Sequence, residues 1–329
     1  MITSRRDALG SIALAGAAMF VARTSALASQ TTPAALPTNP LSLAQWSLHR
    51  TFGLCKPEER PAAVLDPMDF AKISKEQFGI SRVEYVNQFY REKVAEPGFA
   101  KELRKRADDV GVASILIMCD GEGVSGAAAA TERAGFAQNH KKWCELAAAL
   151  GCTAIRVNAR GEGSAEEQIE RCADGITQLL AVAKPFGLNV IVENHGGLSS
   201  DGAWVVKLMQ AIHNDSCGTL PDFGNWRDES GVLHDPVANT ALVMPFAKGC
   251  SAKSYGFDAA GNETTLDYPK LVEIVRSSKY RGPVGIEYEG RSMSEPDGIL
   301  ATKALLLRLG CVVSSVQLGW GICRCHSVY

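Results

Sequence analysis

The feature that most restricts the fold of this chain is a repeated alternation of short apolar segments with longer amphipathic stretches. The short segments predict strands, and the helical periodicity of the stretches between them predicts helices. The eight predicted strands are Leu43–His49, Ser81–Asn87, Ala113–Cys119, Thr153–Asn158, Asn189–Asn194, Gly218–Asp222, Lys248–Lys253 and Val284–Glu289. The predicted helices include Ala100–Val110, Arg133–Leu150, Ala165–Phe186, Ala203–Ile212, Tyr268–Ser278 and Gly298–Leu309.

Strands that alternate with helices form a parallel sheet, and right-handed crossovers wind such a sheet in one direction. Eight units of this kind predict one α/β domain over residues 41–310, closed as a (β/α)₈ TIM barrel. The alternative is a doubly wound open sheet. It is less favoured because no Gly-x-Gly-x-x-Gly loop follows the first predicted strand.

The first 28 residues have the features of a signal peptide. Arg5 and Arg6 precede a short apolar stretch, and Ala26-Leu27-Ala28 offers a small-x-small cleavage site. The paired arginines favour the twin-arginine route over an ordinary Sec signal, and hence a periplasmic or secreted protein. The apolar stretch is too short for a stable membrane anchor. Residues 29–40 are expected to form a flexible lead-in, and residues 311–329 an atypical C-terminal tail without an assigned function.

Charge and cysteine content exclude several classes of protein. The formal net charge is −2, and no basic stripe is present, so nucleic acid is not an expected partner. Ten cysteines occur, but no Cys-x-x-Cys pair has a matching partner pair for zinc. Six of the ten cysteines fall in or directly beside predicted strands or helices, which indicates buried free thiols rather than disulfides.

Acidic residues stand at the ends of three late strands, where a (β/α)₈ barrel carries its functional groups. These are Glu193, Asp222 and Glu287, and alternation along the last strand places Glu289 on the same face as Glu287. Converging carboxylates repel one another unless a cation lies between them. Oxygen ligands favour Mg²⁺ or Mn²⁺, and a nearby histidine extends the choice to Co²⁺ or Zn²⁺. Alternatively, each acid is paired with an arginine, a lysine or a backbone donor.

Four stretches at these strand ends resemble the sugar phosphate isomerase/epimerase superfamily, the xylose-isomerase-like barrels. They are ENHGG from residue 193, PDFGNW from 221, SAKSYGFD from 251 and GIEYEG from 285, and the resemblance covers about Leu41 to Leu309. It implies that Glu193, Asp222 and Glu287 are the first, second and fourth ligands of a divalent metal. The family's third ligand is the His of a His-x-Lys-Asp pattern, and Ser251 stands at that position here, followed by Lys253.

The resemblance also implies that Glu193 and Glu287 move a proton between adjacent carbons of a sugar through an enediolate. The expected function is therefore an isomerase or epimerase acting on a carbohydrate. Alternatives are a lyase on a keto-sugar or keto-glycoside, and a carbohydrate-binding barrel without turnover. An oligomer is possible. Polar residues at the strand ends are the candidate substrate contacts, and these are His49, Glu84, Asn158, Arg160, His195, Asn225 and Lys253.

Several aromatic and histidine residues lie outside this set, and we expect other roles for them. Trp46 is expected to pack in the core or at the rim, whereas Trp226 and Tyr255 suit contacts with a polyhydroxylated ring. His140, His213 and His234 fall away from the strand ends, so we expect them to be structural or solvated.

Overall fold

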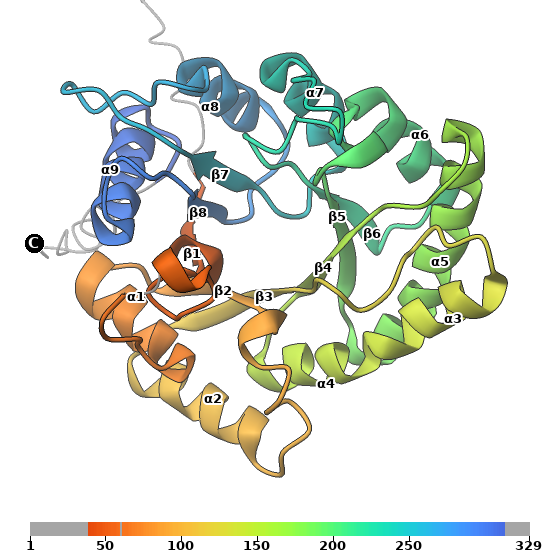
Figure 1. Ribbon diagram of the computed structural model, residues 1–329, viewed down its shortest axis with the longest axis horizontal. Helices are drawn as coiled ribbons and strands as arrows, with labels where there is room; N and C mark the ends of the chain where they lie inside the picture. The colour runs from red at the N-terminus through yellow and green to blue at the C-terminus, as the bar shows by residue number, and fades with distance from the viewer. Residues whose placement is uncertain (1–38, 60, 313–329) are drawn as a thin grey trace, which may run out of the picture. The chain divides into compact units, whose positions relative to one another are not determined.

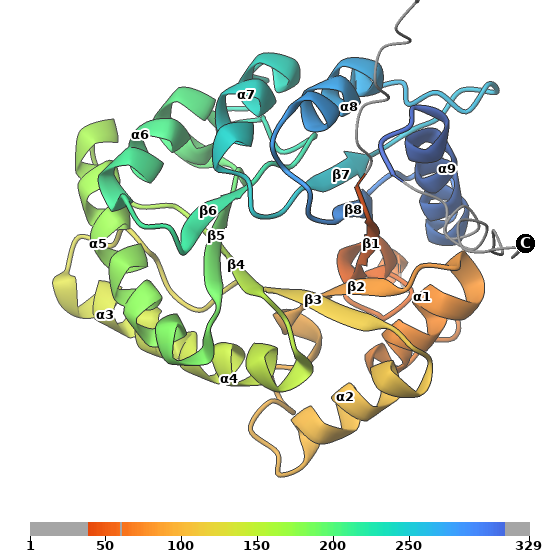
Figure 2. The same cartoon turned by 180° about the vertical axis from the view of Figure 1, so that it is seen from behind.

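A computed structural model describes residues 39–59 and 61–312 of the chain. Within these ranges eight parallel strands form one curled sheet with the helices outside it (Figures 1 and 2). The strands are β1 Leu41–Ala44, β2 Arg82–Val86, β3 Ala113–Met118, β4 Ala154–Asn158, β5 Asn189–Glu193, β6 Cys217–Leu220, β7 Ser251–Ser254 and β8 Val284–Tyr288. The predicted signal peptide, nearly all of the lead-in, and the tail beyond residue 312 lie outside the described residues.

The strand order confirms the predicted (β/α)₈ fold and excludes the doubly wound alternative. Neighbours in the sheet follow the order β6-β5-β4-β3-β2-β1-β8-β7, so β1 pairs with both β2 and β8. The two remaining edges, β6 and β7, meet through isolated parallel bridges, Thr219 with Ala247 and Asp222 with Ser251. The Ser251 N–H donates to the Pro221 carbonyl at 2.9 Å, which helps to close the ring.

Helices cover the outer face of the sheet because each presents an apolar stripe to the valines and isoleucines of the strands. Their bounds are α1 Phe70–Phe78, α2 Phe99–Asp109, α3 Ala130–Asn139, α4 Lys141–Leu150, α5 Ala165–Ala183, α6 Gly202–Ile212, α7 Pro236–Val243, α8 Tyr268–Ser277 and α9 Glu295–Arg308. Among the described helices, none is both long and apolar enough to cross a membrane. The eight cysteines of the described ranges are free thiols, six of them buried.

The first strand is shorter than predicted. β1 ends at Ala44, and Gln45–Leu48 forms a 3₁₀ helix instead of continuing the strand. The Gln45 side chain explains this turn, because its Oε1 accepts from the Val86 N–H at 3.0 Å and its Nε2 donates to Tyr90 Oη at 2.7 Å. Hydrogen bonds between residues so far apart in the sequence cannot be predicted from the local pattern of apolar and polar residues.

The predicted helix Arg133–Leu150 is two helices, α3 and α4, that meet at His140. His140 Nδ1 lies 2.7 Å from the Phe136 carbonyl oxygen, and the ring is only 1% exposed. A histidine predicted to be structural or solvated is therefore buried at a helix junction.

The ends of the described chain join the barrel. The Asn39 N–H donates to the Cys311 carbonyl at 2.9 Å, and Asn39 forms a parallel bridge with Val312. Cys311 and Val312 are both buried, so the first residues of the predicted tail pack against the domain.

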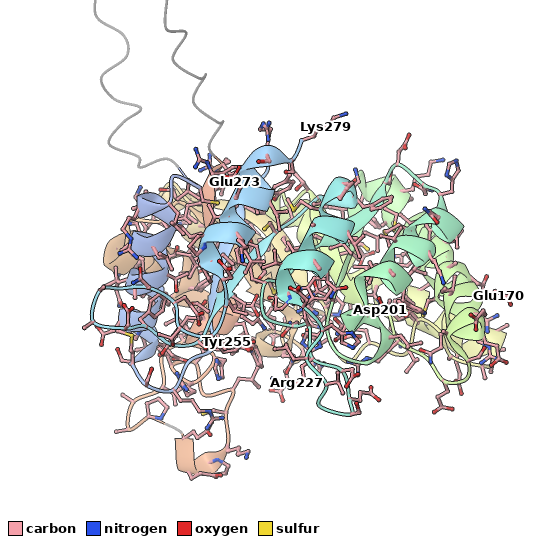
Figure 3. All side chains as sticks on the ribbon, turned by 90° about the horizontal axis from the view of Figure 1, so that it is seen from above. Glu170, Asp201, Arg227, Tyr255, Glu273 and Lys279 are labelled. Atoms are coloured by element: carbon pink, nitrogen blue, oxygen red, sulfur yellow. The ribbon has the colours of Figure 1, made fainter. Side chains whose placement is uncertain are left out.

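The residues that follow the strands lie at one end of the barrel. Figure 3 shows Tyr255 and Arg227 at one end, and Glu273 and Lys279 at the other. Tyr255 and Arg227 follow β7 and β6, so theirs is the carboxyl end of the strands. Functional side chains of such barrels gather at that end.

Candidate active site

Three acids from separate strands meet inside the carboxyl end of the barrel. Glu193 ends β5, Asp222 follows β6 and Glu287 lies on β8. Their side chains are 0%, 0% and 3% exposed, and one oxygen from each lies within 4.8 Å of the other two. The convergence expected from the strand ends is present.

Lys253 on β7 contributes a positive charge to the same cluster. Its Nζ lies 3.1 Å from Glu287 Oε1, 3.2 Å from Glu289 Oε2 and 3.7 Å from Asp222 Oδ2. Lys253 also donates to Asn225 Oδ1 at 3.1 Å. Lys253 is only 1% exposed, so its ammonium group is paired with these acids instead of with water.

Ser251 lies between two of the acids. Its Oγ is 2.7 Å from Asp222 Oδ2 and 3.0 Å from Glu287 Oε2, and its single hydroxyl proton serves one of them at a time. Ser251 and Lys253 are two residues apart on one strand, so both point into the barrel.

Backbone donors fix the orientation of Asp222. Its Oδ1 accepts from the N–H groups of Gly224 and Asn225, both at 2.8 Å. The Asn225 side chain then donates from Nδ2 to Glu193 Oε1 at 3.0 Å. Asn194 bonds both the N–H and the carbonyl of Asp222, at 2.8 and 3.0 Å. Such bonds hold the carboxylates in place without consuming all of their lone pairs.

Arg156 on β4 supplies the second buried positive charge. Its Nη1 donates to Asp120 Oδ1 at 2.7 Å, and Asn158 Nδ2 donates to the same oxygen at 2.7 Å. Its Nε approaches Glu193 Oε2 to 2.7 Å without the alignment of a hydrogen bond. Sequence reasoning overlooked Asp120, although it lies two residues after the end of β3 and so satisfies the same strand-end rule as the other acids.

Burial and charge shift the acid–base properties of the cluster. Burial raises the pKa of Glu193 to about 7 against the opposing effect of Arg156, and raises the pKa of Asp222 to about 7 against that of Lys253. Burial alone would lower the pKa of Lys253, but Asp222, Glu287 and Glu289 hold it well above its usual range. Lysine is therefore a fixed cation, whereas two of the acids titrate near neutrality.

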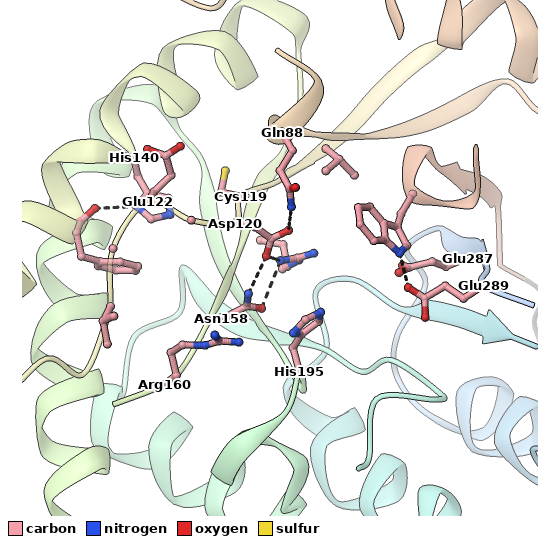
Figure 4. A pocket seen from close by; sticks show the side chains of 17 residues that line it. Gln88, Cys119, Asp120, Glu122, His140, Asn158, Arg160, His195, Glu287 and Glu289 are labelled. Atoms are coloured by element: carbon pink, nitrogen blue, oxygen red, sulfur yellow. Dashed lines mark hydrogen bonds and ion pairs between the residues drawn. The ribbon is translucent and has the colours of Figure 1, made fainter. Parts of the chain in front are cut away.

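A cavity of about 530 Å³ opens beside these groups (Figure 4). Asn158, Arg160 and His195, all predicted to contact substrate, line it together with Glu287 and Glu289. Burial lowers the pKa of His195, as do the charges of Arg156 and Lys253, so the ring is a neutral hydrogen-bonding group. Trp46, which was expected to pack in the core or at the rim, also lines the cavity and donates its Nε1 proton to Glu289.

A model of the xylose isomerase-like TIM barrel family matches residues 75–309. The chain belongs to this family. Among curated proteins, no sequence matches the chain significantly.

Solved structures similar to this family member share its fold at low identity. A probable 3-DHS dehydratase from Bacillus anthracis has a TM-score of 0.60 and 18% identity, over 82% of this chain and 98% of that chain. The 3-keto-D-glucoside 4-epimerase of E. coli has a TM-score of 0.60 and 16% identity, over 74% and 94%. A xylose isomerase-like TIM barrel protein from Mycobacterium smegmatis, in complex with magnesium, has a TM-score of 0.59 and 16% identity, over 83% and 97%.

The acidic cluster of this family member is able to hold a divalent cation. Around the site in the described structure, Asp120, Glu193, Asp222, Glu287 and Glu289 provide five carboxyl groups against the two cations Arg156 and Lys253. Glu193 Oε2 is buried and has no hydrogen-bond partner among the described atoms. An excess of carboxylates, one of them with a buried oxygen that accepts no hydrogen bond from the described residues, is a donor set that suits hard divalent ions.

Two predicted substrate contacts lie elsewhere. His49 stacks on Trp46 with ring centroids 4.8 Å apart, and its Nδ1 lies 3.3 Å from Glu295. Glu84 is buried inside the barrel, where Ser42 Oγ donates to it at 2.6 Å. Neither residue lines the cavity, and neither do the predicted contacts Asn225 and Lys253. The last two contact the acidic cluster directly.

Proposed function

We propose that the protein is a sugar isomerase or epimerase that moves a proton between adjacent carbons of a sugar or sugar derivative. The observation that carries this proposal is the convergence of Glu193 and Glu287 with Asp222 beside a cavity of about 530 Å³ that charged and polar side chains line in part. Family membership and the sugar epimerases among the structural neighbours support it. Glu193 and Glu287 act as base and acid on the substrate carbons.

The neighbouring side chains explain how such a proton becomes removable. A C–H next to a carbonyl is acidic only when the negative charge that develops on the oxygen is stabilised. Lys253, Arg156 and neutral His195 supply positive charge and a hydrogen-bonding group around the acids. The pKa of Glu193, raised to about 7 by burial, lets this residue both accept and return a proton at neutral pH.

The cofactor of this proposal is one divalent ion, Mn²⁺, Mg²⁺, Co²⁺ or Zn²⁺. Glu193, Asp222 and Glu287 would hold it, with Ser251 at the remaining family position. When bound, the ion would polarise a substrate carbonyl as a Lewis acid. Magnesium and zinc in neighbouring structures support a metal in this fold without fixing its identity.

A lyase is the second candidate reaction, because removal of the proton next to a carbonyl is also the first step of an elimination. A dehydratase among the structural neighbours favours this variant. A barrel that binds carbohydrate without turnover is the third candidate, and Ser251 in place of the family histidine favours it.

Solvent-deuterium incorporation into ketoses and aldoses, followed by NMR with and without added Mn²⁺, tests the proposal. We expect exchange at one carbon that disappears in Glu193→Gln and in Glu287→Gln. Glu170→Gln, on the exposed face of α5, is the control and retains exchange. Exchange in both active-site variants at the rate of the unmodified protein would overturn the proposed roles. Saturable sugar binding without exchange would favour the binding protein.

We also propose that the protein acts outside the cytoplasm after export by the twin-arginine route. Arg5 and Arg6 before an apolar stretch support this location. Replacing both by lysine should leave full-length protein in the cytoplasmic fraction. Unchanged export would show instead that an ordinary Sec signal is used.

A further inference from the structure

The cavity extends well beyond the groups that would transfer a proton. Figure 4 shows Glu287 and Glu289 at one end, Glu122 and His140 at the other, and Asp120 between them. We call the far end the distal arm, and it is lined by Glu122, Gly123, Val124, Phe136 and His140. The volume of about 530 Å³ lies within the range of about 300–1,000 Å³ that is typical of pockets for small-molecule ligands.

His140 presents an unused acceptor in the distal arm. Its Nδ1 lies 2.7 Å from the Phe136 carbonyl oxygen, which can only accept, so Nδ1 carries the proton. Nε2 of the neutral ring is then a bare acceptor, and within the described part of the chain it has no hydrogen-bond partner. A buried acceptor without a partner is costly unless a ligand or water satisfies it. A ligand hydroxyl that enters the arm meets this need.

The charges of the distal arm are already paired. Glu122 is 7% exposed, and Lys142 Nζ lies 3.0 Å from its Oε2. Asn87 Nδ2 donates to Oε1 of the same carboxylate at 3.2 Å. Val124 and Phe136 complete the arm with apolar surface. Paired charges, a neutral acceptor and apolar walls fit an uncharged group that carries hydroxyls.

Close backbone contacts fix the loop that forms the arm. Gly126 donates its N–H to the Arg160 carbonyl at 2.9 Å and forms a parallel bridge with Gly161. A Cβ on Gly161 would lie 2.5 Å from the Gly126 carbonyl oxygen, and a Cβ on Gly175 of α5 only 2.1 Å from the Ser125 carbonyl oxygen. Backbones packed this closely cannot shift without loss of contacts, so the arm is formed before any ligand binds.

We propose that the distal arm binds the second unit of a glycoside while the first ring lies at Glu193 and Glu287. This inference rests on the proposed proton transfer and names its substrate class. When the first ring is the glycosyl unit of the glycoside, its anomeric carbon is locked in an acetal. The carbonyl that acidifies a neighbouring C–H must therefore lie at another ring carbon. The substrate is a keto-glycoside, and an enzyme that oxidises a ring hydroxyl of the glycoside must supply it.

Calorimetric titration with two pairs of probes tests the arm without turnover. The probes are glucose and cellobiose, together with the C3-oxidised form of each. We expect the cellobiose forms to bind at least about tenfold more tightly than the glucose forms. Val124→Trp fills the arm and His140→Phe removes its acceptor. Each should abolish that preference and leave affinity for the glucose forms unchanged.

Two further variants guard against indirect effects. Leu242→Trp places the same indole on an exposed position of α7, away from the cavity, and should keep the preference. His140→Gln retains an acceptor at the same place, so partial recovery of the preference relative to His140→Phe supports the assigned role.

Equal affinity for the one-ring and two-ring probes, unaffected by Val124→Trp, overturns the distal arm as a subsite. Deuterium exchange into C3-oxidised glucose then still tests the proton transfer by itself. Conversely, a two-ring preference without any exchange supports the arm and contradicts the proposed reaction, so the two failures are distinguishable.

Discussion

Lys253 and Glu287 face each other directly across the paired strands β7 and β8, with Nζ 3.1 Å from Oε1. Ser251, two residues earlier on β7, stands where the family pattern has a histidine. The strand that would otherwise supply a neutral metal ligand thus supplies a hydroxyl and a fixed positive charge. Part of the charge compensation at this site comes from the chain itself.

Replacing Lys253 by Met should reduce proton exchange by at least about 100-fold, because a buried cation next to the developing oxyanion is lost. The pKa of Asp222 should rise further, since Lys253 is the group that opposes its increase most strongly. Exchange kinetics and the pH at half-maximal rate provide the measurement. Lys270→Met, which removes an exposed lysine of α8, is the matched control. Unaltered exchange in Lys253→Met would exclude a role for the ammonium.

Ser251→His should increase the affinity for Mn²⁺ by at least about tenfold, because imidazole is a stronger ligand than a neutral hydroxyl. The new side chain would start between Asp222 and Glu287, where the serine oxygen now lies 2.7 and 3.0 Å from them. Calorimetry on chelator-treated protein measures the change. Ser251→Ala serves as the comparison and should bind Mn²⁺ no more tightly than the unmodified protein; equal gains in both variants would contradict this reasoning.

The stability of the metal-free protein should depend on pH through Glu193 and Asp222. Burial raises both pKa values to about 7, whereas unfolded acids titrate near pH 4. Between about pH 4 and pH 7 the folded state binds more protons than the unfolded state, so its stability falls as the pH rises.

Thermal unfolding at several pH values checks this dependence. Burial lowers the pKa of His140 and His195, which gives the opposite trend below about pH 6.5, so Asp222→Asn is measured in parallel. We expect a smaller fall in Tm with pH in Asp222→Asn, and a smaller fall in the unmodified protein with saturating Mn²⁺. Identical pH profiles for the two chains would contradict the raised pKa of Asp222.

Gly175→Ala should destabilise the protein by about 1–3 kcal/mol, because the added Cβ would overlap the Ser125 carbonyl oxygen. Gly135 is a helical glycine of α3 with open space around it. Gly135→Ala should therefore stabilise the protein by about 0.5–1 kcal/mol. Urea unfolding of the two variants gives the comparison. A loss of stability in Gly135→Ala equal to that in Gly175→Ala would show that the contact is not the cause.

The fold and the acidic cluster could be predicted because both depend on local pattern and strand order. Glu193, Asp222 and Glu287 lie at the carboxyl ends of the late strands β5, β6 and β8, and closure of the barrel gathers these strand ends around one opening. The distal arm could not be predicted in this way. His140 is significant only because α3 and α4 break at it and turn its ring toward the cavity, and helical periodicity continues across that break.

The same limit applies to charge partners. An arginine or lysine partner was one alternative for each acid, but only the structure shows that one nitrogen of Arg156 binds Asp120 and another approaches Glu193. Side-chain reach and rotamer choice, rather than residue type, select such partners. Glu84 was predicted to contact substrate because it is an acidic residue on β2. In the structure it bonds Ser42 inside the barrel and does not line the cavity.

The junction of β6 and β7 is held by isolated bridges, while the other neighbouring strands share longer ladders. Asp222 belongs to one side of this junction, and Ser251 and Lys253 belong to the other. A ligand that binds residues on both sides of the junction should stabilise the pairing of β6 with β7, since a ligand stabilises the state that it binds. The amide protons of Ser251 and Phe223, which bond across the junction, should then exchange with solvent more slowly. Ligand binding at the site can then be measured by amide hydrogen exchange, without following a reaction.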